Sequence, residues 1–470
     1  MGLRADEEQS PGVLRKMIQA AVRNNSYREG SRELAESAEL AVDAKKLERA
    51  VRRIGGERLA ERDAKVATWQ ELSLAQQQRG CPSQKLPPQV AVVQFDCGRL
   101  LVRERERKSA RGGSAAAIGV SEVAGEVAVQ TAARLAEDEA ACQAEEASAA
   151  PAAETVPGDK NRAPEACRSR FWRDDKVGVL LNMQSAEQDQ DPCPEIPASF
   201  VDPQRTLKLV QELGGSCPSC ERPPEPGGEA PAESARPGAP QPLVKSIVAS
   251  RSSSVVFGAI LAAAAWWRGF AGARRKAFLA DGAAMNWTLW ARFFSHYVPI
   301  LDFIHALQYV FAAAIAGRAF SEGWAVYCRW IEAVWSGGVG EVIAELLRRQ
   351  AELGLAPPDA PATDPRCVVA AALRYLQTHR SRMDYARYRR LGLPIMTAYV
   401  ESAVKQIGRR VKGTEKFWCE VGAEAILQLR ADYLSDTSPL DSFWGRRKER
   451  ATGQRSHQRT ARAPSNHCAA

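Results

Sequence analysis

The stretch 89–107, QVAVVQFDCGRLLVRERER, carries the clearest strand pattern in the chain. Its valines and Phe95 form a β-rich run that ends at Asp96-Cys97-Gly98, and residues 100–102 resume the pattern. We therefore predict a strand, a tight turn and a second strand, with Asp96 at the end of the first strand. An acid beside a glycine at a strand end lies at a sheet edge, where metal sites are usually built.

Two further acids lie in a similar context. Asp281 closes the short apolar run AFLA and is followed by Gly282, and Glu401 lies in AYVESAVKQIGRRVK, a predicted helix. Two-metal phosphoryl transfer requires several carboxylates that converge on ions roughly 3.5–4 Å apart. Magnesium prefers such oxygen ligands. Asp96, Asp281 and Glu401 are therefore candidate metal ligands, although Asp-Gly pairs are commonly simple turns.

The composition is that of a soluble protein with an anionic partner. The chain has 470 residues, enough for two or three domains, with 45% apolar and 26% charged residues and a net charge of +8. The basic excess suits phosphates, and it suits an anionic membrane surface equally well. The N-terminus does not have the pattern of a secretion signal, and the longest apolar run, 254–267, is too short to span a bilayer. We expect a cytoplasmic protein without a membrane partner.

Residues 1–74 are predicted to be helical, with breaks near Glu39 and at Gly55-Gly56. Two short helices with a brief connection, the second rich in basic residues, are typical of a helix-turn-helix that binds DNA. A solvated amphipathic bundle explains the pattern equally well. The basic residues that would contact DNA in the first case are Lys45, Arg49, Arg52 and Arg53.

Three segments are predicted to lack a packed core. Residues 109–168 are rich in Ala, Glu and Gly, residues 214–242 are dense in Pro and Gly, and residues 445–470 form a basic tail. Cys217 and Cys220 have the spacing of half a zinc site, but suitable further ligands are missing from the sequence nearby, so no structural zinc is expected. The region 243–444 holds nine of the eleven tryptophans and should contain the largest core.

Four long segments resemble bacterial insertion-sequence transposases of the DDE class, of the Kra-type group related to Mutator-like transposases. The segments are VAVVQFDCGRLLVRE, FWRDDKVGVLLNMQSAEQDQDPCPEIPASF, FLADGAAMNWTLWARFFSHYVPILDFIHALQYVFAAA and LGLPIMTAYVESAVKQIGRRVKGTEKFWCEVGAEAILQLRADYLSD. They come in the order of the family's own motifs and together cover most of residues 88–445.

The resemblance implies an α/β (α+β) catalytic domain like RNase H: a mixed five-stranded sheet flanked by helices, with an all-helical insertion. Asp96 would fall on the first strand, Asp281 at the end of the fourth, and Glu401 on a helix after the insertion. The implied organisation is a helical region at 1–74, first strands at 88–108, the low-complexity insert at 109–168, more of the RNase H-like domain at 169–213, a linker at 214–242, the RNase H-like core at 243–303, the helical insertion at 304–393, the Glu-bearing helical end at 394–444 and a disordered tail at 445–470.

The implied activity is DNA transposition. Two Mg²⁺ ions, or Mn²⁺ in their place, held by Asp96, Asp281 and Glu401, would support cleavage at the element's ends and attack of the freed 3′-OH on target DNA. The expected partners are double-stranded DNA, namely the terminal inverted repeats and the target, and a second copy of the chain, because two ends must be joined. The expected location is the bacterial cytoplasm, at the nucleoid.

Several residues are candidates for roles near this site. Asp302 and His305 could touch it from one helix face, or could be a helix cap and a packed histidine. The charges of 172–176 either flank the site or pair with one another. The basic, tyrosine-containing run 374–390 and the helix that follows Glu401 suit phosphate contacts. Their candidate DNA-binding residues are Arg380, Arg382, Arg389, Arg390, Arg409, Arg410 and Lys412.

Two features depart from the family pattern. Cys97 stands where the family has a glycine, which tolerates a positive φ that cysteine does not, and the insert 109–168 is longer than the family needs. A catalytically inactive DNA-binding protein derived from a transposase is therefore the alternative hypothesis. A purely structural helical protein is a third, and it predicts that Asp96, Asp281 and Glu401 lie far apart.

Overall fold

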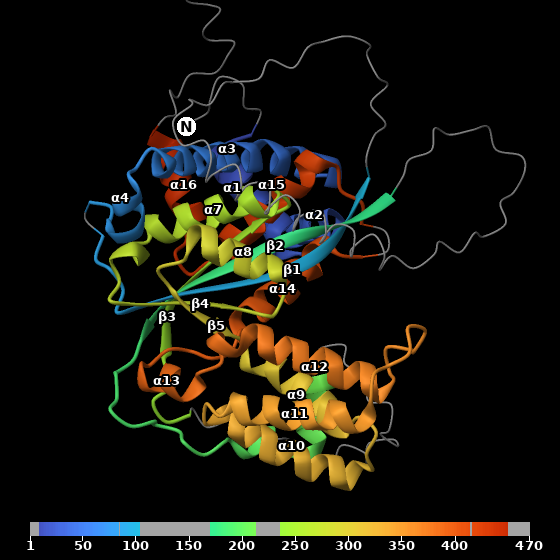
Figure 1. Ribbon diagram of the computed structural model, residues 1–470. Coiled ribbons are helices and arrows are strands. Elements are labelled where there is room, and N and C mark those ends of the chain that lie inside the picture. The colour runs from blue at the N-terminus through green and yellow to red at the C-terminus, as the bar shows by residue number, and fades with distance from the viewer. Residues whose placement is uncertain (1–8, 84, 104–169, 213–235, 414–415, 450–470) are drawn as a thin grey trace, which may run out of the picture.

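The computed structural model describes residues 9–83, 85–103, 170–212, 236–413 and 416–449 (Figure 1). It is a mixed α/β protein built on a five-stranded mixed sheet in the order β3-β2-β1-β4-β5. β1 pairs in antiparallel fashion with β2 and β2 with β3, whereas β1, β4 and β5 run parallel. The strands are β1 (Val90–Arg103), β2 (Arg170–Gln184), β3 (Gln241–Ser250), β4 (Arg275–Ala280) and β5 (Val298–Leu301).

The predicted turn at Asp96-Cys97-Gly98 is wrong, because β1 is one continuous strand through these residues. In the pairing of β1 with β2, Gly98 lies opposite Asp175. A Cβ on residue 98 would come within 2.7 Å of the Asp175 carboxylate, so the glycine makes room for an acid on the neighbouring strand. Cys97 does not adopt a positive φ, and the departure from the family's glycine therefore causes no backbone strain here.

Helices cover both faces of the sheet. α7 (Ser254–Trp267) packs on one face, where its Phe257 ring contacts Phe95 of β1 with ring centroids 5.4 Å apart. α14 (Ala398–Val411) and α15 (Glu420–Tyr433) cover the other face. Because side chains alternate along a strand, Phe95 and Asp96 point to opposite faces, and Asp96 faces α14.

The N-terminal helices belong to the same body as the sheet (Figure 1). They are α1 (Pro11–Arg23), α2 (Tyr27–Ala38), α3 (Ala44–Gln70) and α4 (Leu74–Arg79). The predicted break near Glu39 is confirmed, since this residue ends α2 in the left-handed conformation. The break at Gly55-Gly56 is wrong, because α3 continues through both residues. A Cβ on Gly55 would lie 2.5 Å from the Cβ of Ala425, so Gly55 allows α3 to approach α15 closely.

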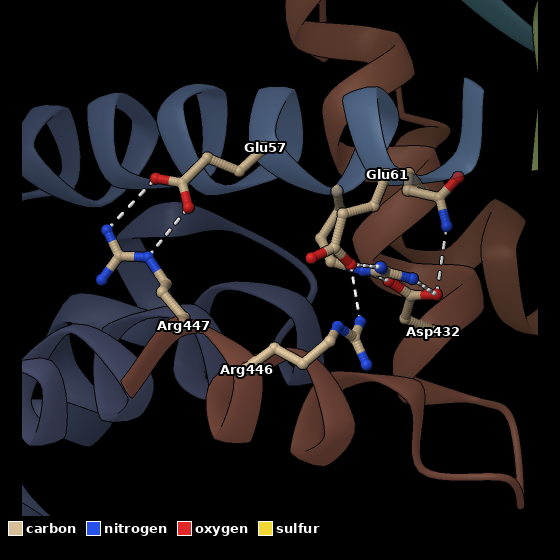
Figure 2. A network of polar contacts seen from close by, with 7 residues as sticks. Glu57, Glu61, Asp432, Arg446 and Arg447 are labelled. Atoms are coloured by element: carbon tan, nitrogen blue, oxygen red, sulfur yellow. Dashed lines mark hydrogen bonds and ion pairs between the residues drawn. The ribbon is translucent and has the colours of Figure 1, made fainter. Parts of the chain in front are cut away.

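Ion pairs join α3 to α15 and to α16 (Pro439–Glu449), as Figure 2 shows. The buried Arg58 binds Asp432 through two hydrogen bonds of 2.8 and 3.2 Å. Arg446 and Arg447 of α16 bind Glu61 and Glu57 of α3 at 2.6 and 2.9 Å. Residues 445–449 are therefore helical, and the prediction that the disordered tail begins at residue 445 is wrong for these five positions.

A second helical body lies beyond the β5 edge of the sheet (Figure 1). The elements of residues 304–393 are helices and connecting loops, which agrees with the helical content expected there. They are α9 (Phe303–Ile315), α10 (Phe320–Trp335), α11 (Val339–Leu353), α12 (Pro365–His379), the short 3₁₀ turn Arg380–Arg382 and α13 (Tyr385–Arg390). Buried Trp330 and Trp335 contribute to its core.

The remaining described helices are short connections between the strands. α6 (Pro203–Glu212) starts after Asp202, whose carboxylate accepts a hydrogen bond from the Arg205 amide at 2.8 Å and so caps the helix. α8 (Ala284–Phe293) links β4 to β5.

The linker predicted at 214–242 is too long by two residues, because β3 starts at Gln241. The insert 109–168, Cys217, Cys220 and most of the tail lie outside the described residues. None of the described helices combines the length and hydropathy needed to cross a membrane.

Candidate active site

Three neighbouring parallel strands each lead into an acid at the same edge of the sheet. The register pairs Gln94 of β1 with Leu279 of β4, so two residues further along the strands Asp96 and Asp281 come level with each other. Asp302 follows β5, and its amide donates to the Ala280 carbonyl at 3.0 Å. The carboxyl ends of parallel strands are the usual place for ligands in open α/β sheets. Strand topology thus brings together acids that are far apart in the sequence.

The side chain of Gln94 holds the start of α14 against β1. Its Oε1 accepts a hydrogen bond from the Val400 amide at 3.1 Å, and its Nε2 donates to the Met396 carbonyl at 3.0 Å. Glu401 lies in the first turn of this helix and accepts a hydrogen bond from the Thr397 hydroxyl at 3.3 Å. The buried amide of Gln94 therefore positions the helix that carries the third predicted ligand beside the strand that carries the first.

Asp302 and His305 form a tight pair at the start of α9. Asp302 is fully buried, caps the helix and accepts a hydrogen bond from the Thr397 amide at 3.0 Å. His305 Nδ1 lies 2.7 Å from the other Asp302 oxygen. Burial lowers the pKa of His305, but the hydrogen bond to Asp302 and the charges of Asp302, Asp281 and Glu401 outweigh it and raise the pKa to about 9. With this pKa, His305 is a cation at neutral pH, and the charges of the neighbouring carboxylates favour its protonated form. The predicted helix cap at Asp302 is confirmed, and the charges of Asp281 and Glu401 act on His305.

The electrostatics of Asp96 show that the three predicted ligands lie near one another. Burial is the main cause that raises the pKa of Asp96 to about 6, and the charges of Asp281 and Glu401 raise it further. The Cys97 amide, which donates to the Asp96 carboxylate at 2.7 Å, and the charge of His305 act in the opposite direction. A carboxyl group that burial and like charges disfavour as an anion gains free energy when a cation is bound nearby.

Each of these carboxylates uses one oxygen for local hydrogen bonds. Asp281 Oδ1 accepts hydrogen bonds from the Ala283 amide, at 2.9 Å, and from the side chain of Asn286. Within the described part of the chain, the second oxygens of Asp96, Asp281 and Glu401 accept no hydrogen bond, and no Lys or Arg forms an ion pair with any of the three. Oxygen atoms that are oriented but not neutralised are suitable ligands for a hard divalent ion.

The carboxylates do not enclose a metal ion as they stand, since among the described residues no group of three or more His, Cys, Asp or Glu side chains is arranged to hold one. The donor chemistry nevertheless fits magnesium, which needs one or two carboxylates and retains several waters. The charges of Asp281 and Glu401 act on Asp96, which favours proximity of the three acids over the wide separation that the purely structural hypothesis predicts.

A stacked pair of tyrosines borders Asp281. The rings of Tyr309 in α9 and Tyr375 in α12 are nearly parallel, with centroids 3.7 Å apart. Tyr375 packs against Gly282, where any side chain would collide with its ring. Burial raises the pKa of both phenols, and the charge of Asp281 raises it further. The helical insertion thus reaches the acid cluster through these two rings.

Asp175 is a buried acid. The sequence predicted only that the charges of 172–176 either flank the site or pair with one another. It is 1% exposed, neither of its oxygens has a hydrogen-bond partner in the described structure, and it lies on the same face of the sheet as Asp96. Burial raises its pKa to about 6, although Lys412 acts against this shift. Of the charges in 172–176, Asp174 pairs with Arg99 at 3.4 Å.

The predicted DNA-binding residues divide into surface and buried groups. Lys45, Arg49, Arg52, Arg380, Arg390, Arg409 and Lys412 are exposed, and Arg53 and Arg382 are partly buried. Arg389 and Arg410 are instead buried, although Arg410 also lines a pocket. Arg389 is 7% exposed, binds Asp191 at 2.9 Å and lies over the Trp335 ring. Arg382 lies 4.2 Å from the Trp287 ring centre.

Sequence patterns missed three residues that shape the site. Gln94, Asn286 and Thr397 orient α14, Asp281 and Asp302, respectively. A glutamine within the apolar run of β1 was the only visible signal, since a buried amide in a strand requires partners.

A scan against models of known protein families gives no match to the chain, and a search of curated proteins finds no significant relative.

Proposed function

We propose that this protein is a DDE-type DNA transposase with an RNase H-like catalytic domain. The observation that carries the proposal is the electrostatic coupling of Asp96 to Asp281 and Glu401 beside a mixed five-stranded sheet, where each acid has an oxygen that accepts no hydrogen bond from the described residues. Asp96 lies on β1, Asp281 follows β4, and Glu401 lies on α14 after the helical insertion, in agreement with what the sequence resemblance implies.

The residues divide the work of such a site. Asp96 and Asp281 would hold the ions most directly, Glu401 would complete the shell of the second ion, and Asn286 would keep Asp281 oriented. Bound there, two Mg²⁺ or Mn²⁺ ions would supply an activated water for attack on a phosphodiester and would stabilise the leaving 3′ oxygen. His305, a cation at neutral pH, would offset part of the negative charge of the acids and of the DNA.

Double-stranded DNA is the proposed partner, with terminal inverted repeats and target DNA bound in turn by a homodimer. Exposed basic residues near the acid cluster support this, among them Arg374, whose charge acts on Tyr309, a residue that the charge of Asp281 also reaches. Surface cations give affinity for DNA largely through the release of counterions, so binding should weaken steeply with salt.

The test is a cleavage assay with supercoiled plasmid that carries the gene together with its flanking DNA. We expect Mg²⁺- or Mn²⁺-dependent strand cleavage at the borders of the element. Asp96→Asn, Asp281→Asn and Glu401→Gln should each abolish cleavage and leave DNA affinity largely unchanged. Asp359→Asn, which removes an exposed acid between α11 and α12, is the matched control and should cleave like the wild type.

Two outcomes contradict the proposal. Cleavage by Asp281→Asn at the wild-type rate would show that this carboxylate does not hold a catalytic ion. DNA binding without cleavage by the wild-type protein, at borders with intact inverted repeats and with either metal, would favour the alternative, a catalytically inactive DNA-binding protein derived from a transposase.

A further inference from the structure

A separate, positively charged pocket lies where α2, α14 and α15 meet. It has a volume of about 240 Å³, and three basic side chains, Arg52, Arg410 and Lys416, contribute to its wall. Glu48 also lines it and is bound to Arg52. Tyr27 and Trp418 form its aromatic sides. Basic residues thus outnumber acids in the wall, which favours an anionic ligand.

Arg410 is the central observation. It is 2% exposed, and it lies between two aromatic rings, 4.5 Å from the centre of Tyr27 and 5.2 Å from that of Trp418. Its Nε donates to the Ala21 carbonyl at 2.9 Å and its Nη1 to the Asn25 carbonyl at 3.4 Å, yet its Nη2 has no hydrogen-bond partner among the described residues. A buried guanidinium with an unused donor is costly unless a partner completes it.

The N-terminus of α15 opens onto the same pocket. Its N-cap residue, Cys419, gives no side-chain hydrogen bond to the first turn, and Cys419 and Gly422 both line the pocket. Uncapped amides and the positive end of the helix dipole attract anions. The N-terminus of α2 is different, because the Ser26 hydroxyl accepts a hydrogen bond from the Glu29 amide at 3.1 Å and so caps the helix.

Lys416 completes the set of donors. Its ammonium group donates to the carbonyls of Arg409 and Arg410 at 3.0 and 3.3 Å, which leaves one of its three N–H groups for a ligand. Burial, followed by the charge of Arg410, lowers the pKa of Lys416, and burial lowers the pKa of Arg410. An anion in the pocket would relieve both effects.

We propose that this pocket binds one phosphate group through Arg410, Lys416, Arg52 and the first turn of α15. The source of the phosphate is a phosphodiester of bound DNA, a statement that rests on the proposed function. The pocket differs from the acid cluster in its charge and in its residues. It would hold the DNA backbone on the α2–α15 side of the protein and add affinity without reading sequence.

Binding of the phosphate group itself can be measured without metal or DNA. We expect inorganic phosphate to bind the full chain saturably in calorimetric titration or by ³¹P NMR. Lys416→Gln should weaken this binding at least about tenfold, because it removes a charged hydrogen bond. Lys405→Gln, an exposed residue of α14 outside the pocket, is the matched control and should bind like the wild type. Arg410→Lys, which retains the charge but loses the fork of donors, should also bind weakly.

The DNA arm measures duplex affinity against salt concentration. Loss of one phosphate contact should lower the slope of log K against log [salt] by about 0.9 in Lys416→Gln but not in Lys405→Gln. No saturable phosphate binding by the wild type, or equal phosphate binding by Lys416→Gln, would overturn the site whatever the protein does to DNA. Phosphate binding with an unchanged salt slope would overturn DNA as the source and point to free phosphate or a nucleotide. Failure of cleavage alone leaves both measurements unaffected.

Discussion

Two clusters of acids in this protein differ in whether basic side chains of the described structure neutralise them. Between α3, α15 and α16, the acids Glu57, Glu61 and Asp432 are all paired with arginines (Figure 2). Asp96 within β1 and Asp281 after β4 lie near Glu401 without an arginine or lysine bound to any of them in the described structure.

The pKa shifts record this difference. Burial raises the pKa of Glu61, but the hydrogen bonds and charges of Arg446 and Arg58 outweigh it, so the net shift is downward. At Asp96, burial and like charges raise the pKa to about 6. The first cluster is neutralised within the chain and stabilises the fold. The second retains its charge repulsion, which is typical of a site that a cation completes.

The largest expected effect is on the paired cluster. Asp432→Ala removes an acidic partner of the buried Arg58. Because a buried charge is then left partly unpaired, the variant should lower the free energy of unfolding by about 3–5 kcal/mol, measured by urea denaturation. Asp441→Ala breaks an exposed pair with Arg15 and should cost at most about 1 kcal/mol. Equal losses in the two variants would show that the buried network does not stabilise the fold more than a surface pair.

The unpaired Asp175 should respond in the opposite direction. Its pKa of about 6 lies above the unfolded value near 3.8, so ionisation opposes folding as pH rises from about 4 to 6. Asp175→Asn should therefore be more stable than the wild type by about 1–3 kcal/mol at pH 7.5, and the gain should vanish below about pH 4. Thermal denaturation at the two pH values measures this, and a destabilised variant at pH 7.5 would show that the charged form has a partner.

Orientation of Asp281 by Asn286 can be tested through metal affinity. Asn286→Ala removes a hydrogen bond to the proposed ligand and should weaken Mn²⁺ binding about 10–100-fold, a typical effect of residues that orient metal ligands. Asn24→Ala, which removes an amide far from the site between α1 and α2, is the control. Unchanged Mn²⁺ affinity in Asn286→Ala would mean that Asp281 does not bind the ion.

The smallest expected effect is on His305. Its pKa of about 9 depends partly on the charges of Asp281 and Glu401, so bound Mg²⁺ should lower it by about one unit. NMR titration of the histidine side chains with and without Mg²⁺ measures the change. His296, whose pKa burial lowers to about 4, lies in another pocket and should not respond. A His305 pKa that is insensitive to Mg²⁺ argues against an ion at these acids.

The sequence predicted most of the strands, the helices of 304–393 and the position of Asp281 after a strand, because each depends on local patterns of apolar residues, but it wrongly ended the first strand at Asp96. The prediction failed where a glycine allows the close approach of a segment that is distant in the sequence. Gly98 and Gly55 both suggested breaks, yet one makes room for Asp175 and the other for Ala425. A turn signal and a close approach require the same small residue, and only the fold distinguishes them.

The basic residues were harder to assign for a related reason. Arg389 and Arg410 have the sequence context of surface contacts, but Asp191 and the rings of Trp335, Tyr27 and Trp418 bury them. Apart from Trp418, these partners come from distant segments, so burial could not be predicted from the neighbouring residues. The same limit applies to Gln94, whose partners are about 300 positions away.

The most direct test of the two-metal site is electron paramagnetic resonance of the protein titrated with Mn²⁺. We predict two bound Mn²⁺ ions per chain, close enough for their spins to couple, since ions in such sites lie about 3.5–4 Å apart. The coupled signal should disappear in Asp96→Asn and in Asp281→Asn and persist in Asp359→Asn. Absence of bound Mn²⁺ in the wild type, or a coupled pair that survives Asp96→Asn, would contradict the assignment of these carboxylates as the metal site.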